Sequence, residues 1–163
     1  MGAEPIRKAV LSRRSLLAAL PLLSAAANPV QAKDYGSPQE ALDEMDRLAG
    51  ICGMRLGALR RSRASADLLV SRFLRALQKH RDTREATRHK FGLPKGADPA
   101  SQLGDVDGAL AGLQKALDDL MSAYGESLPV FGDAMTVSRL AVDMVDVSRL
   151  RTVIDLWIDS EAA

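Results

Sequence analysis

The chain has 163 residues, which is the size of a single domain. Aromatic residues make up only 4% of it, a composition that favours helices over sheets. A single cysteine excludes an internal disulfide framework, a Cys-rich zinc site and a cysteine-ligated iron–sulfur cluster. The net charge of +1 argues against a strongly basic nucleic-acid-binding protein.

Residues 1–32 have the pattern of a cleavable export signal. A basic stretch comes first, and the apolar run LLAALPLLSAAA follows from Leu16 to Ala27. A run of 12 apolar residues is too short to span a bilayer as a helix, which takes about 20 residues. Small residues then precede a predicted cleavage between Ala32 and Lys33. We therefore expect a periplasmic or secreted protein without a stable transmembrane span.

Within this segment, two adjacent arginines follow a polar residue and precede two leucines. This arrangement resembles the twin-arginine export motif, and its residues here are Ser12, Arg13, Arg14, Leu16 and Leu17. The resemblance implies passage through the twin-arginine translocase, whose cargo often carries a cofactor or travels docked to a partner. An ordinary secretory signal that contains an arginine pair is the alternative.

Two helices are predicted in the first half of the remaining chain, at about 38–60 and 65–91. Ser37 is a suitable N-cap for the first helix, with Pro38 at its first position and Glu40 three residues after the cap. Gly92 and the proline that follows it at position 94 predict where the second helix ends.

Two more helices are predicted at about 105–128 and 130–160, each with apolar residues at helical spacing. Four such helices with short connections predict an all-α domain over residues 33–163, an antiparallel four-helix bundle. The size, the helix number and the export signal resemble those of small exported ferritin-like proteins. However, the Glu-x-x-His ligand motif of that family does not occur in the chain.

Basic and acidic residues are unevenly distributed along the chain. Residues 60–90 hold ten basic and three acidic side chains, whereas residues 91–163 hold five basic and twelve acidic side chains. One interpretation is that the basic helix pairs internally with acidic neighbours. The other is a surface for an anionic partner, made of Arg72, Arg75, Lys79, Arg84, Arg88 and, on the last helix, Trp157. Asp143 and Asp146 are expected to form solvated ion pairs on the last helix.

His80 is the first candidate ligand of a metal ion or haem, because it continues the apolar stripe of the second helix. Sulfur ligands on other predicted core faces would be Met45, Cys52, Met121 and Met144. Such a set suits iron, haem or copper. The alternative is that these residues simply fill the core.

The sequence contains no recognisable motif of a catalytic site. The apolar face of helix 130–160 is wider than one bundle can bury, which leaves a surface for a partner. We therefore expect a non-catalytic accessory protein that binds another exported protein or a second copy of itself. A metal- or haem-binding bundle, of ferritin-like or b-type cytochrome-like kind, is the alternative.

Overall fold

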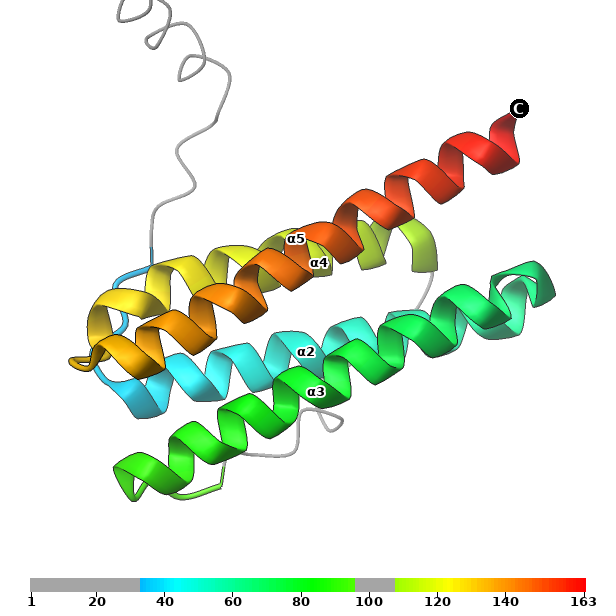
Figure 1. Ribbon diagram of the computed structural model, residues 1–163. Coiled ribbons are helices and arrows are strands. Elements are labelled where there is room, and N and C mark those ends of the chain that lie inside the picture. The colour runs from blue at the N-terminus through cyan, green and yellow to red at the C-terminus, as the bar shows by residue number, and fades with distance from the viewer. Residues whose placement is uncertain (1–32, 96–107) are drawn as a thin grey trace, which may run out of the picture. The chain divides into compact units, whose positions relative to one another are not determined.

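The computed structural model describes residues 33–95 and 108–163, and every regular element in these two ranges is helical. Figure 1 shows the four long helices lying side by side as a bundle. They are α2 (Pro38–Ser62), α3 (Asp67–Phe91), α4 (Ala109–Ser127) and α5 (Ala134–Ala162), with short 3-10 turns η2 (Ala64–Ala66) and η4 (Leu128–Val130). The predicted all-α four-helix bundle is thus confirmed, whereas the predicted export segment lies outside the described residues.

Ion pairs between the helices define their relative directions. Arg88, near the end of α3, pairs with Asp43 near the start of α2, and Lys90 pairs with Asp133, which caps the start of α5. α3 is therefore antiparallel to both α2 and α5, and η4 turns the chain from α4 into an antiparallel α5. It follows that α3 and α4 run in the same direction, so α3 ends at one end of the bundle and α4 begins at the other (Figure 1).

The ends of α2 and α3 follow the signals in the sequence. The Ser37 hydroxyl accepts a hydrogen bond from the Glu40 backbone N–H (3.2 Å), and the Glu40 carboxylate accepts one from the Gly36 N–H (3.0 Å). At the end of α3, Gly92 adopts φ 64°, and its N–H and that of Leu93 bond back to the last turn of the helix. A left-handed residue cannot continue a right-handed helix, so α3 ends here. Glycine occupies this position because a side chain at that φ would be strained.

The last helix begins later than predicted. α5 begins at Ala134 rather than near residue 130, because the Asp133 carboxylate caps it by accepting the Thr136 N–H (3.0 Å). Residues 128–130 form the separate turn η4. α4 is described from Ala109, after Gly108 in the left-handed region at φ 69°, and residues 105–107 of the predicted helix lie outside the described ranges.

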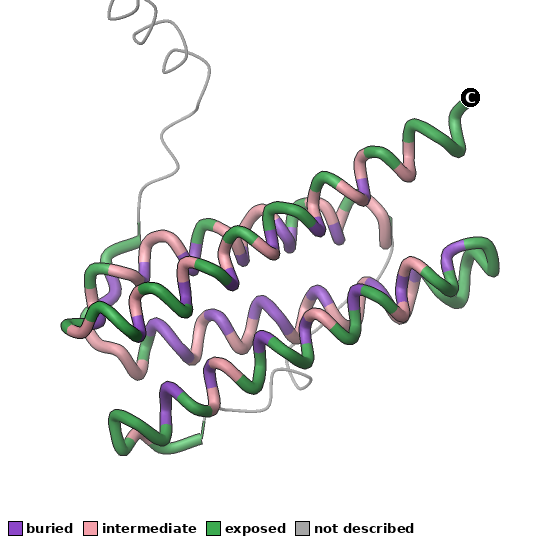
Figure 2. The backbone as a smooth tube through the Cα atoms, viewed as in Figure 1, coloured by how far each residue is buried: buried purple, intermediate pink, exposed green. Residues whose placement is uncertain are grey.

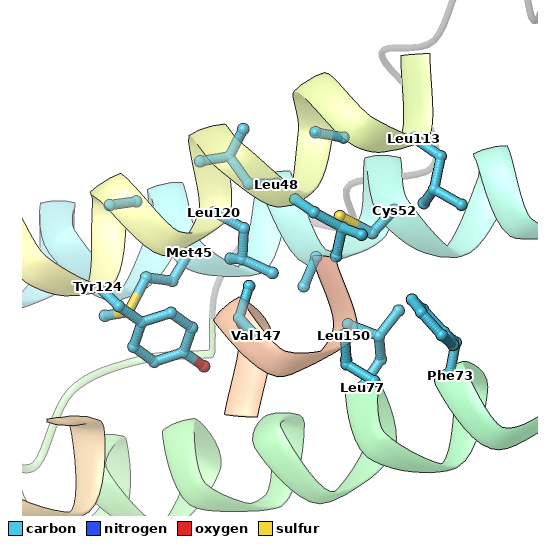
Figure 3. Close-up of a cluster of buried hydrophobic side chains, with 14 of the residues drawn as sticks. Met45, Leu48, Cys52, Phe73, Leu77, Leu113, Leu120, Tyr124, Val147 and Leu150 are labelled. Atoms are coloured by element: carbon cyan, nitrogen blue, oxygen red, sulfur yellow. The ribbon is translucent and has the colours of Figure 1, made fainter. Parts of the chain in front are cut away.

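An apolar core runs between the four helices. Figure 2 shows the buried positions on the sides of the helices that face one another and the exposed positions along the outside. Figure 3 shows side chains of all four helices meeting in this core, among them Met45, Cys52, Phe73, Leu77, Leu113, Leu120, Tyr124, Val147 and Leu150. Burial of apolar side chains at these positions supplies most of the free energy that holds the helices together. Among the residues that the structure describes, no helix is both long and apolar enough to cross a bilayer.

Candidate functional site

Two arginines of α3 are buried in an ion-pair network near one end of the bundle. Arg84 donates from Nε to Asp46 Oδ1 of α2 and from Nη1 to the Tyr124 hydroxyl of α4 (2.7 Å). Arg88 donates from Nη2 to Asp43 Oδ1 and to Asp46 Oδ2, both at 2.8 Å. Both arginines are only 2% exposed. The network joins three helices through charge-assisted hydrogen bonds.

The burial of Arg84 and Arg88 corrects one prediction. Both were expected on a partner surface, but they continue the inward stripe of α3 that passes through Leu77 and His80. Their spacing at i+4 and i+8 from His80 carried this signal in the sequence. Internal charge pairing, the other interpretation of the basic helix, accounts for these two residues.

The ion pairs also determine the ionisation of the groups around Arg84. Burial by itself lowers the pKa of this guanidinium, but Tyr124 and Asp46 outweigh it, and the net pKa is raised. Burial raises the pKa of Tyr124 to about 12, against the opposing effect of Arg84. At neutral pH the arginine is charged and the phenol is neutral, which fits a structural network better than acid–base chemistry.

His80 is fully buried one turn before Arg84, as the sequence predicted for an inward residue. Its ring packs edge-to-face against Tyr124, with the ring centroids 6.3 Å apart. The Nε2 atom lies 3.8 Å from Asp146 Oδ2, too far for a hydrogen bond, and neither ring nitrogen has a partner among the described residues. Burial, with Arg84 as the next cause, lowers the pKa of His80 to about 4. The imidazole is therefore neutral at pH 7.

Asp143 lies on α5 opposite α3 and is 2% exposed, so the predicted solvated ion pair is wrong for this residue. Burial raises its pKa to about 6, against the lowering effects of Thr83 and Arg84. Its Oδ2 atom has no hydrogen-bond partner among the described residues. Asp146, one turn later, is partly exposed as expected and pairs with Lys79 (3.3 Å) and Arg149 (3.4 Å).

The remaining candidate ligands are distributed over the core. Met45 and Cys52 are fully buried on α2, and burial raises the pKa of the Cys52 thiol to about 12. Met121 and Met144 are partly buried on α4 and α5, with the Met144 sulfur close against Gly125. In the described ranges no three side chains of His, Cys, Asp or Glu are arranged to hold a metal ion.

Three basic residues of α3 do lie on the surface as predicted. Arg72, Arg75 and Lys79, which we call the basic row, are exposed at i, i+3 and i+7 on one side of the helix. Lys79 pairs with Asp146 of α5, so this row borders α5. No ion pair within the described part of the chain involves Arg72 or Arg75. Trp157, in contrast, is partly buried beneath Arg63, whose guanidinium carbon lies 5.5 Å from the ring centroid.

The outer side of α5 carries apolar residues that the bundle does not cover. Met135 is 61% exposed, Val142 54%, Val145 46% and Leu156 63%. These four residues belong to a row spaced alternately by three and four residues, which we call the outer seam: Met135, Ser138, Val142, Val145, Arg149, Thr152 and Leu156. All seven are exposed. The buried side of α5 has a similar spacing, through Thr136, Leu140, Asp143, Val147, Leu150 and Ile154.

The spacing of the outer seam is a signal that sequence reasoning missed. The sequence predicts the apolar excess of the last helix, but as one wide face. The structure divides it into a buried row and an exposed row on roughly opposite sides, each with the heptad-like spacing of helices that pack together.

The residues of the predicted export motif and Ala32 lie outside the described residues, and Lys33 is the first residue described. The Lys33 ammonium lies 5.2 Å from the centre of the Tyr35 ring and 3.8 Å from the Glu44 carboxylate. None of the protein-family models, curated proteins or solved structures compared with this chain matches it.

Proposed function

We propose that this chain is an exported, non-catalytic accessory protein that docks to another exported protein through the outer side of α5. The N-terminal residues that resemble a twin-arginine signal support export. The observation that carries the docking proposal is the outer seam, where four large apolar side chains are about half exposed or more. Full burial of such a side chain contributes roughly 1.5–3 kcal/mol, so a partner that covered this seam would gain substantial affinity.

The interior polar groups favour a structural role over catalysis. Arg84 and Arg88 are engaged with the aspartates of α2, and an engaged guanidinium is not available to a substrate. His80 is fully buried, and its lowered pKa leaves it a weak base. These groups support a rigid bundle that presents a surface.

The docking proposal is tested by purifying the epitope-tagged full chain from the envelope fraction of its own cells. We expect one exported protein to co-purify in a stoichiometric complex. The double variant V142D/V145D should lose this protein, because it places two charges in the outer seam. The matched variant A111D changes an exposed residue on α4 and should retain it. A strictly monomeric chain, or equal recovery with both variants, overturns the proposal.

A second candidate function is metal or haem binding through His80. It is favoured by the fully buried imidazole, whose two ring nitrogens lack partners among the described residues and which is neutral at pH 7, as a ligand must be. The common direction of α3 and α4 also occurs in ferritin-like bundles, which have one long crossover connection. Against it stands the absence of a His, Cys, Asp or Glu triad in the described ranges.

Elemental analysis separates the two candidates. The protein is purified without metal-affinity steps and assayed for iron, copper, manganese, zinc and haem. One metal atom or haem per chain that is lost in a folded H80A variant would establish the second function. Sub-stoichiometric metal that H80A does not change would exclude His80 as a ligand.

A further inference from the structure

We infer that the partner presents one amphipathic helix to this chain, with an apolar stripe that packs along the outer seam of α5 and acidic residues that face the basic row of α3. This inference rests on the proposed docking function and adds the chemistry of the partner. The observations that carry it are the spacing of the outer seam, the position of Arg149 within it and the charge of the neighbouring α3.

The spacing selects a helix as the docking element. From Met135 to Leu156 the outer seam keeps alternating steps of three and four residues for three heptads. Side chains in this arrangement form a narrow, slowly winding row about 30 Å long, which is the pattern that packs against a second helix. Exposed apolar positions at Val142 and Val145 lie at the centre of the row, where a packed helix would exclude water best.

Arg149 determines the charge required at one point of that contact. It lies in the row between Val145 and Leu156 and is 76% exposed, and its single ion pair among the described residues is a 3.4 Å contact with Asp146. Covering this guanidinium with an apolar surface would cost the loss of its hydration without compensation. A carboxylate on the partner helix opposite Arg149 would compensate for that loss.

The basic row also favours acidic residues on the partner helix, along the edge that faces α3. Lys79 is already shared with Asp146, but Arg72 and Arg75 pair with no carboxylate in the described ranges. Because α5 runs antiparallel to α3 and Lys79 pairs with Asp146, Arg72 and Arg75 lie level with the part of α5 that follows Asp146. A helix seated on the outer seam there has these two guanidinium groups along its edge, which favours acidic residues on that edge.

A second copy of the chain fits this surface less well. If two outer seams paired in parallel, Arg149 would meet its own equivalent. If they paired antiparallel in full register, Arg149 would lie opposite Val142, because the midpoint of the row falls between residues 145 and 146. Neither arrangement supplies a carboxylate from the opposing seam.

An anionic membrane is also a poorer occupant. Interfacial membrane-binding surfaces are wide and rich in Trp, Phe and Leu. The outer seam is one residue wide, contains no aromatic residue, and is interrupted by Ser138 and Thr152. A partner helix can pack along such a narrow row, whereas a bilayer needs a wider apolar surface.

The first experiment maps the contact in cells that express the full chain. A photo-crosslinking amino acid is placed at Val145, and a matched control is placed at Ser122, which is exposed on α4. We expect Val145 to crosslink a different exported protein at a helix with an apolar heptad stripe and an acidic edge, and Ser122 to give no such product. A distinct protein whose contacting segment is not helical or has no acidic edge overturns this inference but leaves the docking function standing. Crosslinks only to a second copy, or none, overturn both.

The second experiment measures the charge preference directly. Two synthetic helical peptides of three heptads share one apolar stripe, but one has Glu at the flanking positions and the other has Lys. The purified protein should bind the Glu peptide at least about tenfold more tightly, and R72E/R75E should abolish this preference. The control R81E should leave the preference intact, because Arg81 shares the α2 side of α3 with Arg84 and Arg88. Equal binding of both peptides, binding of neither, or equally tight binding to anionic phospholipid vesicles overturns the inference.

Discussion

Arg84 of α3 donates a hydrogen bond to the hydroxyl of Tyr124 of α4 at 2.7 Å, across the interior of the bundle. The two residues belong to the helices that lie diagonally opposite and run in the same direction. The same arginine is held by Asp46 of α2, so one side chain links three of the four helices. The polar interior therefore defines how α3 sits against α2 and α4.

Removing this arginine should destabilise the fold strongly. We expect R84L to lower the free energy of unfolding by roughly 3 kcal/mol, because it removes one of the two arginines that hold the partly buried Asp46 and also the hydrogen bond to the Tyr124 hydroxyl. Urea denaturation followed by circular dichroism measures the change. The matched variant R81L, at an exposed position on the same helix, should stay within about 0.5 kcal/mol of the parent. Equal effects of the two variants would show that the network contributes nothing to stability.

His80 should make the fold less stable as the pH falls. Its pKa is lowered to about 4 in the folded state from an ordinary value of 6.5, so the unfolded chain binds the proton more readily. The contribution of His80 to the free energy of unfolding is therefore complete above pH 6.5 and is lost as the pH falls toward 4. Asp143 acts in the opposite direction, because its folded pKa is raised to about 6 from 3.8 and protonation in this window favours the folded state.

The two opposing groups can be separated by single substitutions. With D143N, the free energy of unfolding should fall more steeply than in the parent between pH 6.5 and 4. With H80F, it should instead fall less steeply or rise over the same range. Both profiles are measured relative to the parent, so that Asp146, Lys79 and the other groups facing this site contribute equally. Parallel profiles of all three proteins would contradict the assignment of these two pKa shifts.

Two glycines should respond to alanine in opposite directions. G92A forces a side chain into φ 64° at the end of α3 and should cost about 1 kcal/mol of stability. G53A lies inside α2, where a Cβ meets nothing within 4 Å, and should stabilise the fold by roughly 0.5–1 kcal/mol. Thermal unfolding of the two variants beside the parent measures the decrease in stability expected for G92A and the increase expected for G53A. Destabilisation by G53A would show that α2 needs the glycine for close packing.

Export should depend on the arginine pair of the N-terminal segment. We expect R13K/R14K to leave the chain in the cytoplasm as an unprocessed precursor, because the twin-arginine motif that the segment resembles needs both guanidinium groups. The matched control R7K changes an arginine outside the motif and should export normally. Cell fractionation and N-terminal sequencing of the exported form, expected to begin at Lys33, provide the readout. Normal export of R13K/R14K would indicate an ordinary secretory signal.

The positions of α2 and α3 were predictable because they depend on local chemistry. Ser37 caps α2 and Gly92 ends α3 as the sequence indicates, since each acts through its own neighbouring backbone. The start of α5 differs from the prediction although Asp133 carries the signal, because the apolar residues at 130 and 131 continue the helical pattern without belonging to α5. A cap determines a helix start more reliably than hydrophobicity does.

The sequence by itself determined the fold class, because helical apolar spacing and capping residues act over one or two turns and need no distant partner. Only the tertiary structure decided which charged residues lie inside. Arg84 and Arg72 are both arginines on one basic helix, yet one is buried against Asp46 and the other remains exposed. The difference arises because a charge can be buried only where a neighbouring helix supplies its counter-ion, and the pairing of helices is a long-range property of the packed chain.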